Sequence, residues 1–168
     1  PFMSAQPAKI AGIAARVLRV SFTGELAFEI YVAAGHGLAL WEALIAAGSD
    51  LGITPFGTEA LHVLRAEKGF FVVGHDADAT VSPHDLGIDA LIGQKKSDFI
   101  GKRSLARTEL RRGGRLQFVG ITPEESAIVV TEGSPIIETA HAGAVDRPPV
   151  PCIGRVTSSY HSPTLGRS

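Results

Sequence analysis

Apolar and polar residues alternate in the first part of the chain in a way that predicts strands. From Lys9 to Val32 the sequence is rich in Ile, Val and Phe, and it is interrupted at Gly12 and at Thr23-Gly24. Such runs between turn residues are typical of short strands joined by tight turns. Residues at every second position from 16 to 22 would lie on one face of a strand, and we expect this face to be half-buried. They are Arg16, Leu18, Val20 and Phe22, and Val17 is an apolar exception on the other face.

Further along the chain a helical spacing replaces the alternation. Apolar residues recur at intervals of three and four over residues 36–47, which predicts an amphipathic helix that Gly48 closes. A similar spacing predicts a second helix over residues 58–68, with Gly69 as its stop. The apolar run over residues 70–73 then favours a short buried strand.

The last third of the chain reads mainly as β structure. Residues 101–112 predict a short helix with a basic face, and the stretch 141–151 is too rich in Pro for a strand, so we expect a loop there. Short apolar runs separated by Gly, Pro and Ser predict four strands, the pattern of a small antiparallel β-barrel or sandwich. They cover residues 116–122, 128–131, 136–139 and 153–160.

These elements predict an α+β protein with a boundary near residue 100. We expect one domain over residues 1–100 and a second, mostly β domain over residues 101–168. The chain begins without an initiator Met and stops abruptly, so we also expect it to be a piece of a longer protein.

Composition and charge limit which kinds of partner and which cellular locations we expect. Hydrophobic residues make up 45% of the 168 residues and charged residues 20%, which predicts a packed fold. The net charge of -1 gives no basic field for a nucleic acid. No apolar run reaches the roughly 18 to 20 residues that span a bilayer. We expect a soluble, cytoplasmic protein that binds neither nucleic acid nor a membrane, and its single Cys152 suits a reducing compartment.

One loop contains several side chains of the types that bind metal ions. His75 and His84 flank an acidic loop that contains Asp76, Asp78 and Asp85. Their spacing is not that of a rigid ligand set, and polar loops collect such residues for solvation, so we expect no metal.

The segment from Ser21 to Ile30 carries the most informative residues. It predicts a strand, a Gly turn and a returning strand, with Glu25 and Glu29 four residues apart and therefore on one face. A solvated hairpin face explains this pattern on the residues alone. A carboxylate turned inward between Phe28 and Ile30 would instead need a partner to offset its desolvation, for example a ligand with two hydrogen-bond donors.

Four ordered blocks of sequence carry a resemblance to a known family. They are Thr23-Gly24-Glu25 to Phe28-Glu29-Ile30, Leu64 to Gly69, Asp98 to Lys102, and Thr157-Ser158 with Ser162 to Gly166. In this order and spacing the chain resembles the aminomethyltransferase (glycine-cleavage T-protein) superfamily. The fuller wording of the first two blocks is most similar to the carboxy-terminal part of the alpha subunit of heterotetrameric sarcosine oxidase.

The resemblance implies a fold and a set of ligand residues. The fold would be a truncated folate-binding, aminomethyltransferase-like α/β domain followed by a small antiparallel β-barrel. Glu29 would accept hydrogen bonds from the pteridine of tetrahydrofolate, and Glu25, Phe28 and Arg65 are further candidates for cofactor contacts, although Arg65 has an equally good structural interpretation. Leu61 stands where T-proteins have an arginine for the glutamyl tail of folate. The resemblance assigns no catalytic residue.

The resemblance also implies a reaction. A flavin elsewhere in a sarcosine oxidase complex would oxidise sarcosine, and this domain would pass the one-carbon unit to tetrahydrofolate, giving glycine, 5,10-methylenetetrahydrofolate and hydrogen peroxide. The partners would be the other subunits, which would also hold flavin and NAD, and the chain alone would be inactive. An aminomethyltransferase of the glycine cleavage system is the alternative. A non-enzymatic interaction protein of the same fold is a third, and its expected cysteine is replaced here by Phe70.

Overall fold

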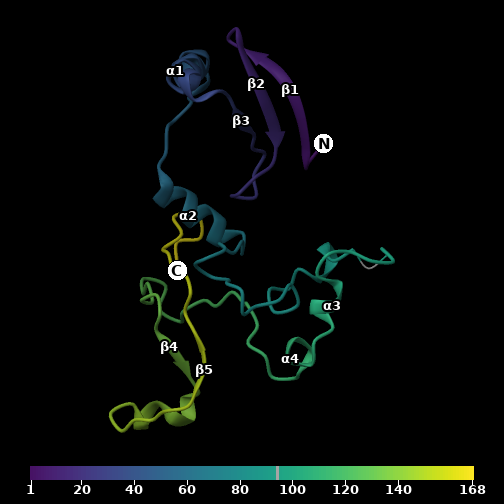
Figure 1. Cartoon of the computed structure of the whole chain (residues 1–168). Helices are drawn as coiled ribbons and strands as arrows, with labels where there is room; N and C mark the ends of the chain where they lie inside the picture. Colours follow the sequence, from purple (N-terminus) through teal and green to yellow (C-terminus); the bar gives the residue numbers. More distant parts are fainter. Residues whose placement is uncertain (94) are drawn as a thin grey trace. The chain divides into compact units, whose positions relative to one another are not determined.

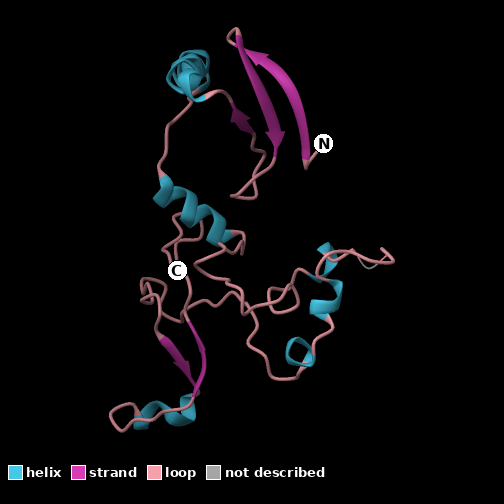
Figure 2. Ribbon diagram, viewed as in Figure 1, coloured by secondary structure: helices cyan, strands magenta, loops and turns pink. Residues whose placement is uncertain are grey.

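The computed structural model describes residues 1–93 and 95–168, which belong to an α+β protein with small antiparallel sheets (Figures 1 and 2). The chain divides into two units, Pro1–Phe70 and Phe71–Ser168. No helix among the described residues is long and apolar enough to cross a membrane. The expected division near residue 100 stays a prediction.

The first unit is built on a three-stranded antiparallel sheet. Strands β1 (Ser4–Ile10), β2 (Ile13–Arg19) and β3 (Glu29–Tyr31) lie in this order. A two-residue turn at Ala11 and Gly12, both with positive φ, joins β1 to β2. Such turns match the twist of the strands and favour glycine, so Gly12 permits the hairpin.

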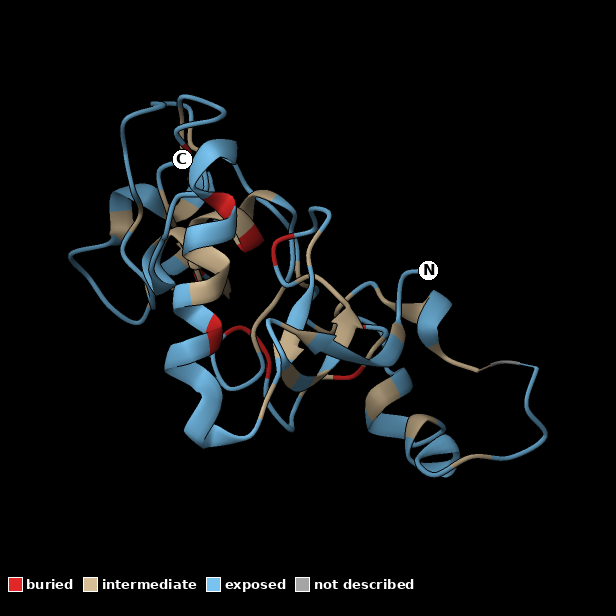
Figure 3. Ribbon diagram, turned by 90° about the horizontal axis from the view of Figure 1, so that it is seen from above, coloured by how far each residue is buried: buried red, intermediate tan, exposed pale blue. Residues whose placement is uncertain are grey.

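Strand β1 is mostly exposed, whereas residues of intermediate exposure recur along β2 (Figure 3). Side chains alternate between faces along a strand. In β2 the more covered face includes Val17 and Arg19, whereas Arg16 on the opposite face is exposed. The expectation that Arg16, Leu18, Val20 and Phe22 form the half-buried face is therefore wrong for Arg16 and Phe22, which are exposed, while Leu18 and Val20 have intermediate exposure. The strand ends at Arg19, so Val20 and Phe22 do not continue its alternation.

Both long helices of the first unit agree with the predictions from apolar spacing. Helix α1 spans Gly37–Gly48 and helix α2 spans Thr58–Glu67. Short 3-10 turns flank α1 at Ala34–His36 and Ser49–Leu51. Gly69 ends α2 as expected, because its φ of 70° lets the Phe70 N–H reach the carbonyl of Arg65 at 2.9 Å.

The second unit contains shorter elements. Strands β4 (Pro135–Ile137) and β5 (Cys152–Arg155) form a two-stranded antiparallel sheet. Helices α3 (Lys102–Leu105) and α4 (Thr108–Arg111) take the place of the single helix expected over residues 101–112, because the backbone is extended at Arg107. Two 3-10 turns complete the unit, at Asp89–Leu91 and Thr139–Ala144.

The expected β-barrel does not form within the described residues. Strands appear in two of the four predicted places, and their sheet is not closed. Residues 116–122 and 128–131 are not strands, and the run 70–73 contributes only an isolated bridge between Val73 and Ala77. An apolar run becomes a strand only when a neighbouring strand accepts its backbone hydrogen bonds, and these segments have no such ladder.

Buried side chains are polar more often than apolar. The buried apolar residues are Leu40, Ala77 and Val156. The buried polar ones are Thr23, Arg65, Asp76, Ser82, Asp85 and Ser162. Hydrogen bonds to side chains therefore determine much of the local structure.

Candidate functional site

The loop between β2 and β3 carries the acidic segment that the sequence singles out. Its first part turns at Gly24, which has a φ of 81°. Glu25 lies in this turn, exposed, with its Oε1 atom 3.4 Å from Nζ of Lys68. A hydrogen bond from Thr23 and the nearby Lys68 ammonium lower the pKa of the Glu25 carboxyl below its usual value.

The expectation that Glu25 and Glu29 share one face of a strand is wrong. Strand β3 begins only at Glu29, so the four residues before it do not alternate like a strand. Glu25 instead pairs with Lys68, the residue that caps the carboxyl end of α2. The two carboxylates therefore have separate partners.

Arg19 holds the second half of this loop against the end of the sheet. Its Nη1 atom donates to the carbonyl of Ala27 at 3.2 Å. Its guanidinium carbon lies 5.4 Å from the ring centre of Phe28 and 5.9 Å from that of Phe2. Both distances are in the range of cation–π attraction. Phe28, one of the predicted ligand residues, is 58% exposed and packs on Arg19.

Glu29 is exposed on the open face of the sheet. The carboxylate is not turned inward as the inward-facing interpretation required, because it is Ile30, the next residue, that lies on the more covered face. The Tyr31 hydroxyl donates a hydrogen bond of 2.5 Å to Oε2 of Glu29. This hydrogen bond to a carboxylate raises the pKa of Tyr31.

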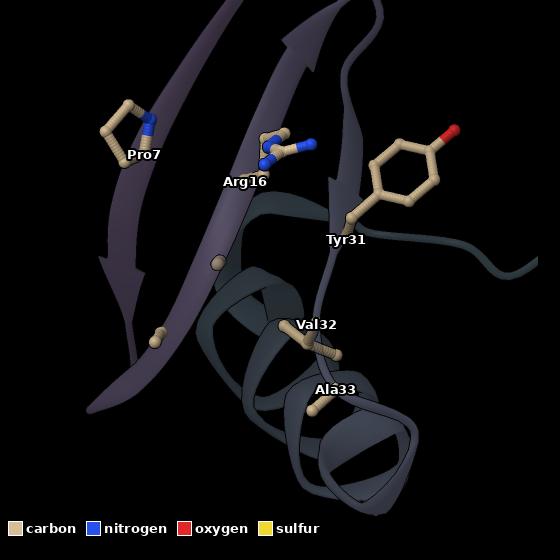
Figure 4. A pocket seen from close by; sticks show the side chains of 7 residues that line it. Pro7, Arg16, Tyr31, Val32 and Ala33 are labelled. Atoms are coloured by element: carbon tan, nitrogen blue, oxygen red, sulfur yellow. The ribbon is translucent and has the colours of Figure 1, made fainter.

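An open hollow of about 400 Å³ adjoins this pair. Pro7, Arg16 and Tyr31 face one another across the three strands, so they lie on one face of the sheet. In Figure 4 the Arg16 side chain extends toward Tyr31. Because Glu29 is two residues from Tyr31, it lies on this same face. The full lining is Pro7, Ala14, Ala15, Arg16, Tyr31, Val32 and Ala33.

Arg65, the fourth predicted ligand residue, is buried near the end of α2. Only 1% of its surface is exposed, and its Nη1 atom donates to the carbonyl of Phe70 at 3.1 Å. This contact supports the turn that ends the helix. It agrees with the structural interpretation of Arg65, while a contact with a ligand stays a prediction.

The acidic loop with His75 and His84 does not gather into one cluster. His75 faces Glu132 at 3.2 Å, and His84 pairs with Asp89. Asp76 accepts hydrogen bonds from the Val72 N–H and from Ser158, and Asp78 accepts them from Thr80. In residues 1–93 and 95–168 no three His, Cys, Asp or Glu side chains are grouped as a metal ion would need.

Sequence reasoning missed three residues near the candidate site. Tyr31 could have been found, because a residue two positions after Glu29 in a strand shares its face. Arg16 required the register that pairs it with Tyr31. Arg19 required the path of the loop, since its contacts with Ala27 and Phe28 depend on how that loop folds back.

Residues 1–96 match the family described as the GCVT N-terminal domain. The chain belongs to this family, which confirms the resemblance to the glycine-cleavage T-protein superfamily. Among individual proteins it is similar to the sarcosine oxidase subunit alpha of Corynebacterium sp. (strain P-1), with 47% identity over 169 residues. It is 39% identical over 168 residues to the subunit of that name from Rhizobium meliloti.

The shared region is a small part of these relatives. The two alignments cover 99% of this chain but 17% of the Corynebacterium subunit and 16% of the Rhizobium subunit. An aminomethyltransferase from Streptomyces coelicolor is 32% identical over 166 residues, which is 96% of this chain and 41% of that protein. The similarity therefore extends over almost the whole chain in both groups of relatives.

Proposed function

We propose that this chain is the tetrahydrofolate-binding part of a sarcosine oxidase alpha subunit. The observation that carries the proposal is the alignment of 99% of the chain with sarcosine oxidase alpha subunits at 47%, 45% and 39% identity. The aminomethyltransferases align at 32% to 36%. The order of identities favours the oxidase, and the other subunits of that complex are the proposed partners.

Glu29 is the proposed acceptor for the pterin ring. The 2-amino group and the N3–H of a pterin form a pair of adjacent donors, and a carboxylate accepts such a pair side by side. The exposed position of Glu29 leaves its carboxylate open to a ligand on the face that carries the hollow. A pterin analogue without these donors would leave the carboxylate unpaired on binding, so the contact would select for the pterin edge.

The remaining candidates have supporting roles in this proposal. Phe28 offers an exposed ring beside Glu29. Glu25 ties the loop before β3 to Lys68, and Arg65 supports the turn after α2 through the Phe70 carbonyl. The proposed division near residue 100 separates this folate-binding part from a second domain.

The proposed chemistry transfers one carbon between two sites of the complex. A flavin held elsewhere in the oxidase would take two electrons from sarcosine, and oxygen would be reduced to hydrogen peroxide. The carbon of the resulting imine would pass to N5 and N10 of tetrahydrofolate, leaving glycine and 5,10-methylenetetrahydrofolate. The contribution of this chain would be to hold the two amines in place, so that proximity lowers the barrier.

Replacement of Glu29 by Ala in the complete oxidase tests this role. We expect formation of 5,10-methylenetetrahydrofolate at a fixed folate concentration to fall by about 100-fold, because two hydrogen bonds to a charged acceptor are lost. The rate of hydrogen peroxide formation from sarcosine should stay within about twofold, and formaldehyde should be released instead. Both products are measured in the same reaction.

Glu42→Ala is the control, since it removes an exposed carboxylate of α1 that the proposed site does not use. It should leave the folate-dependent product largely unchanged. A Glu29 variant that loses sarcosine oxidation but keeps folate binding would show that the assigned role is wrong. Activity with a lipoylated carrier protein, and none with sarcosine, would favour the aminomethyltransferase.

A further inference from the structure

Among the described residues, the side chain of Glu29 is held by a hydrogen bond from its own strand. Glu29 and Tyr31 are the first and last residues of β3, and the Tyr31 hydroxyl donates to Oε2 at 2.5 Å. An exposed glutamate otherwise rotates about three bonds, and a ligand that binds it must stop this motion. A tyrosine rotates about two, so it is a comparatively rigid donor.

The hydrogen bond from Tyr31 leaves room for a second partner. An ionised carboxylate offers about four acceptor positions on its two oxygens, and Tyr31 uses one of them on Oε2. Oε1 and the remaining position on Oε2 can still accept two adjacent donors. The contact therefore fixes the carboxylate without blocking the paired acceptance that a pterin edge needs.

Tyr31 also connects the carboxylate to the hollow. Its ring forms part of the lining, and Arg16 lies directly opposite on β2. Glu29 itself is not part of the lining, so Tyr31 is the residue that the carboxylate and the hollow share. The hollow has a volume of about 400 Å³ and is wide open to solvent, so it offers one wall for a ligand and not an enclosed cavity.

We infer that Tyr31 is a positioning residue that orients the Glu29 carboxylate toward a planar heteroaromatic ligand with two adjacent N–H donors. This inference rests on the proposed function. It adds a specific role for the hydroxyl of Tyr31, which acts through Glu29, while its ring remains part of the wall of the hollow. Tyr31→Phe removes the hydroxyl and keeps the ring, so it isolates the orienting contact.

Four versions of the complete oxidase test the inference: wild type, Tyr31→Phe, Glu29→Gln and the double variant. Each is titrated with tetrahydrofolate, and the KM for sarcosine is measured by hydrogen peroxide formation. We expect Tyr31→Phe to raise the Kd for tetrahydrofolate roughly fivefold, because the Glu29 side chain is then ordered only on binding. In the Glu29→Gln background the same change should have little further effect, because the amide has one acceptor oxygen and cannot accept the two adjacent donors side by side however it is oriented.

The outcomes separate the two proposals. If Glu29→Gln weakens binding and Tyr31→Phe does not, the orienting role is overturned and the proposed function stands. An equal loss from Tyr31→Phe in both backgrounds would show that Tyr31 acts independently of Glu29, which also overturns the inference. If Glu29→Gln leaves the Kd unchanged, the proposed site itself is wrong. A change in the sarcosine KM in Tyr31→Phe would show a general structural effect and would likewise overturn the orienting role.

Discussion

Asp85 is a buried carboxylate of the second unit that Arg115 and Ser82 hold in place. Its side chain is 3% exposed, and Nη2 of Arg115 lies 2.6 Å from its Oδ2. The N–H and hydroxyl of Ser82 donate to the same oxygen at 2.8 and 2.9 Å. Arg115 also donates to the carbonyl of Thr80. These contacts join two segments that lie 30 residues apart in the sequence.

Replacement of Asp85 by Asn should loosen the turn that contains Ser82. The neutral amide loses the charge-assisted contacts with Arg115, which costs about 2 kcal/mol. In the complete protein we expect the amide of Ser82 to exchange hydrogen for deuterium roughly 30-fold faster, read by mass spectrometry of peptides over residues 80–90. Asp89→Asn, at a half-exposed carboxylate, is the control and should change little. Unchanged exchange in Asp85→Asn would contradict the structural role of the pair.

The same contact predicts a pH dependence. The Arg115 guanidinium, followed by the hydrogen bonds from Ser82, holds the pKa of Asp85 well below its usual value against the opposing effect of burial. A carboxyl with a lowered folded-state pKa stabilises the fold above its unfolded pKa, about 3.9, and this contribution declines as the pH falls below that value. Protection of the Ser82 amide, corrected for intrinsic exchange, should therefore decline from pH 5 to pH 3 in the wild type and less in Asp85→Asn.

At the level of single residues, the sequence singled out Glu29 but did not predict its surroundings, and its role as a ligand residue stays a prediction. Glu29 was selected because of its place in the block Phe28-Glu29-Ile30, and the structure places it on an exposed face beside a hollow. Strand alternation predicts that Glu29 and Tyr31 share a face, so a contact between their side chains could have been predicted. The contact between Arg19 and Phe28 could not, since it depends on the path of the loop.

Among the elements, the two long helices were predictable, whereas the helix expected over residues 101–112 and several strands were not. The apolar spacing and the closing glycines located α1 and α2 to within a residue or two, because a helix satisfies its hydrogen bonds within one segment. A strand needs a partner that local sequence does not specify. Residues 116–122 have a suitable composition, yet they do not pair into a ladder.

Two glycines at opposite ends of α1, Gly37 and Gly48, should respond in opposite ways to replacement by alanine. A Cβ at Gly48 would lie 2.7 Å from both Cβ and Cγ2 of Ile53, whereas a Cβ at Gly37 would meet no atom within 4 Å. We expect Gly48→Ala to destabilise the end of the helix by about 1 to 2 kcal/mol through steric overlap. Gly37→Ala should stabilise the helix by about 0.5 kcal/mol, because alanine restricts the unfolded chain.

Hydrogen exchange of peptides over residues 37–53 in the complete protein measures both changes. The prediction is that they have opposite signs, with faster exchange in Gly48→Ala and equal or slower exchange in Gly37→Ala. Equal effects of the two substitutions would contradict the close packing of Gly48 against Ile53.

For the molecule as a whole, the sequence predicted the family and the structure did not need to correct it. The order of four blocks along the chain was sufficient, and the match over residues 1–96 confirms it. Burial was less predictable, since large apolar side chains such as Leu26 and Phe28 are exposed, at 75% and 58%. In the proposed alpha subunit, further residues would supply surfaces for such side chains, and these are not specified by the 168 residues of this chain.

The most direct test of the account is a crystal structure of the complete protein with tetrahydrofolate bound. We predict that the two carboxylate oxygens of Glu29 accept hydrogen bonds of roughly 2.7 to 2.9 Å from the 2-amino group and the N3–H of the pterin. The Tyr31 hydroxyl should still donate to Oε2. A pterin edge held by another carboxylate, with Glu29 facing solvent, would contradict the proposed site.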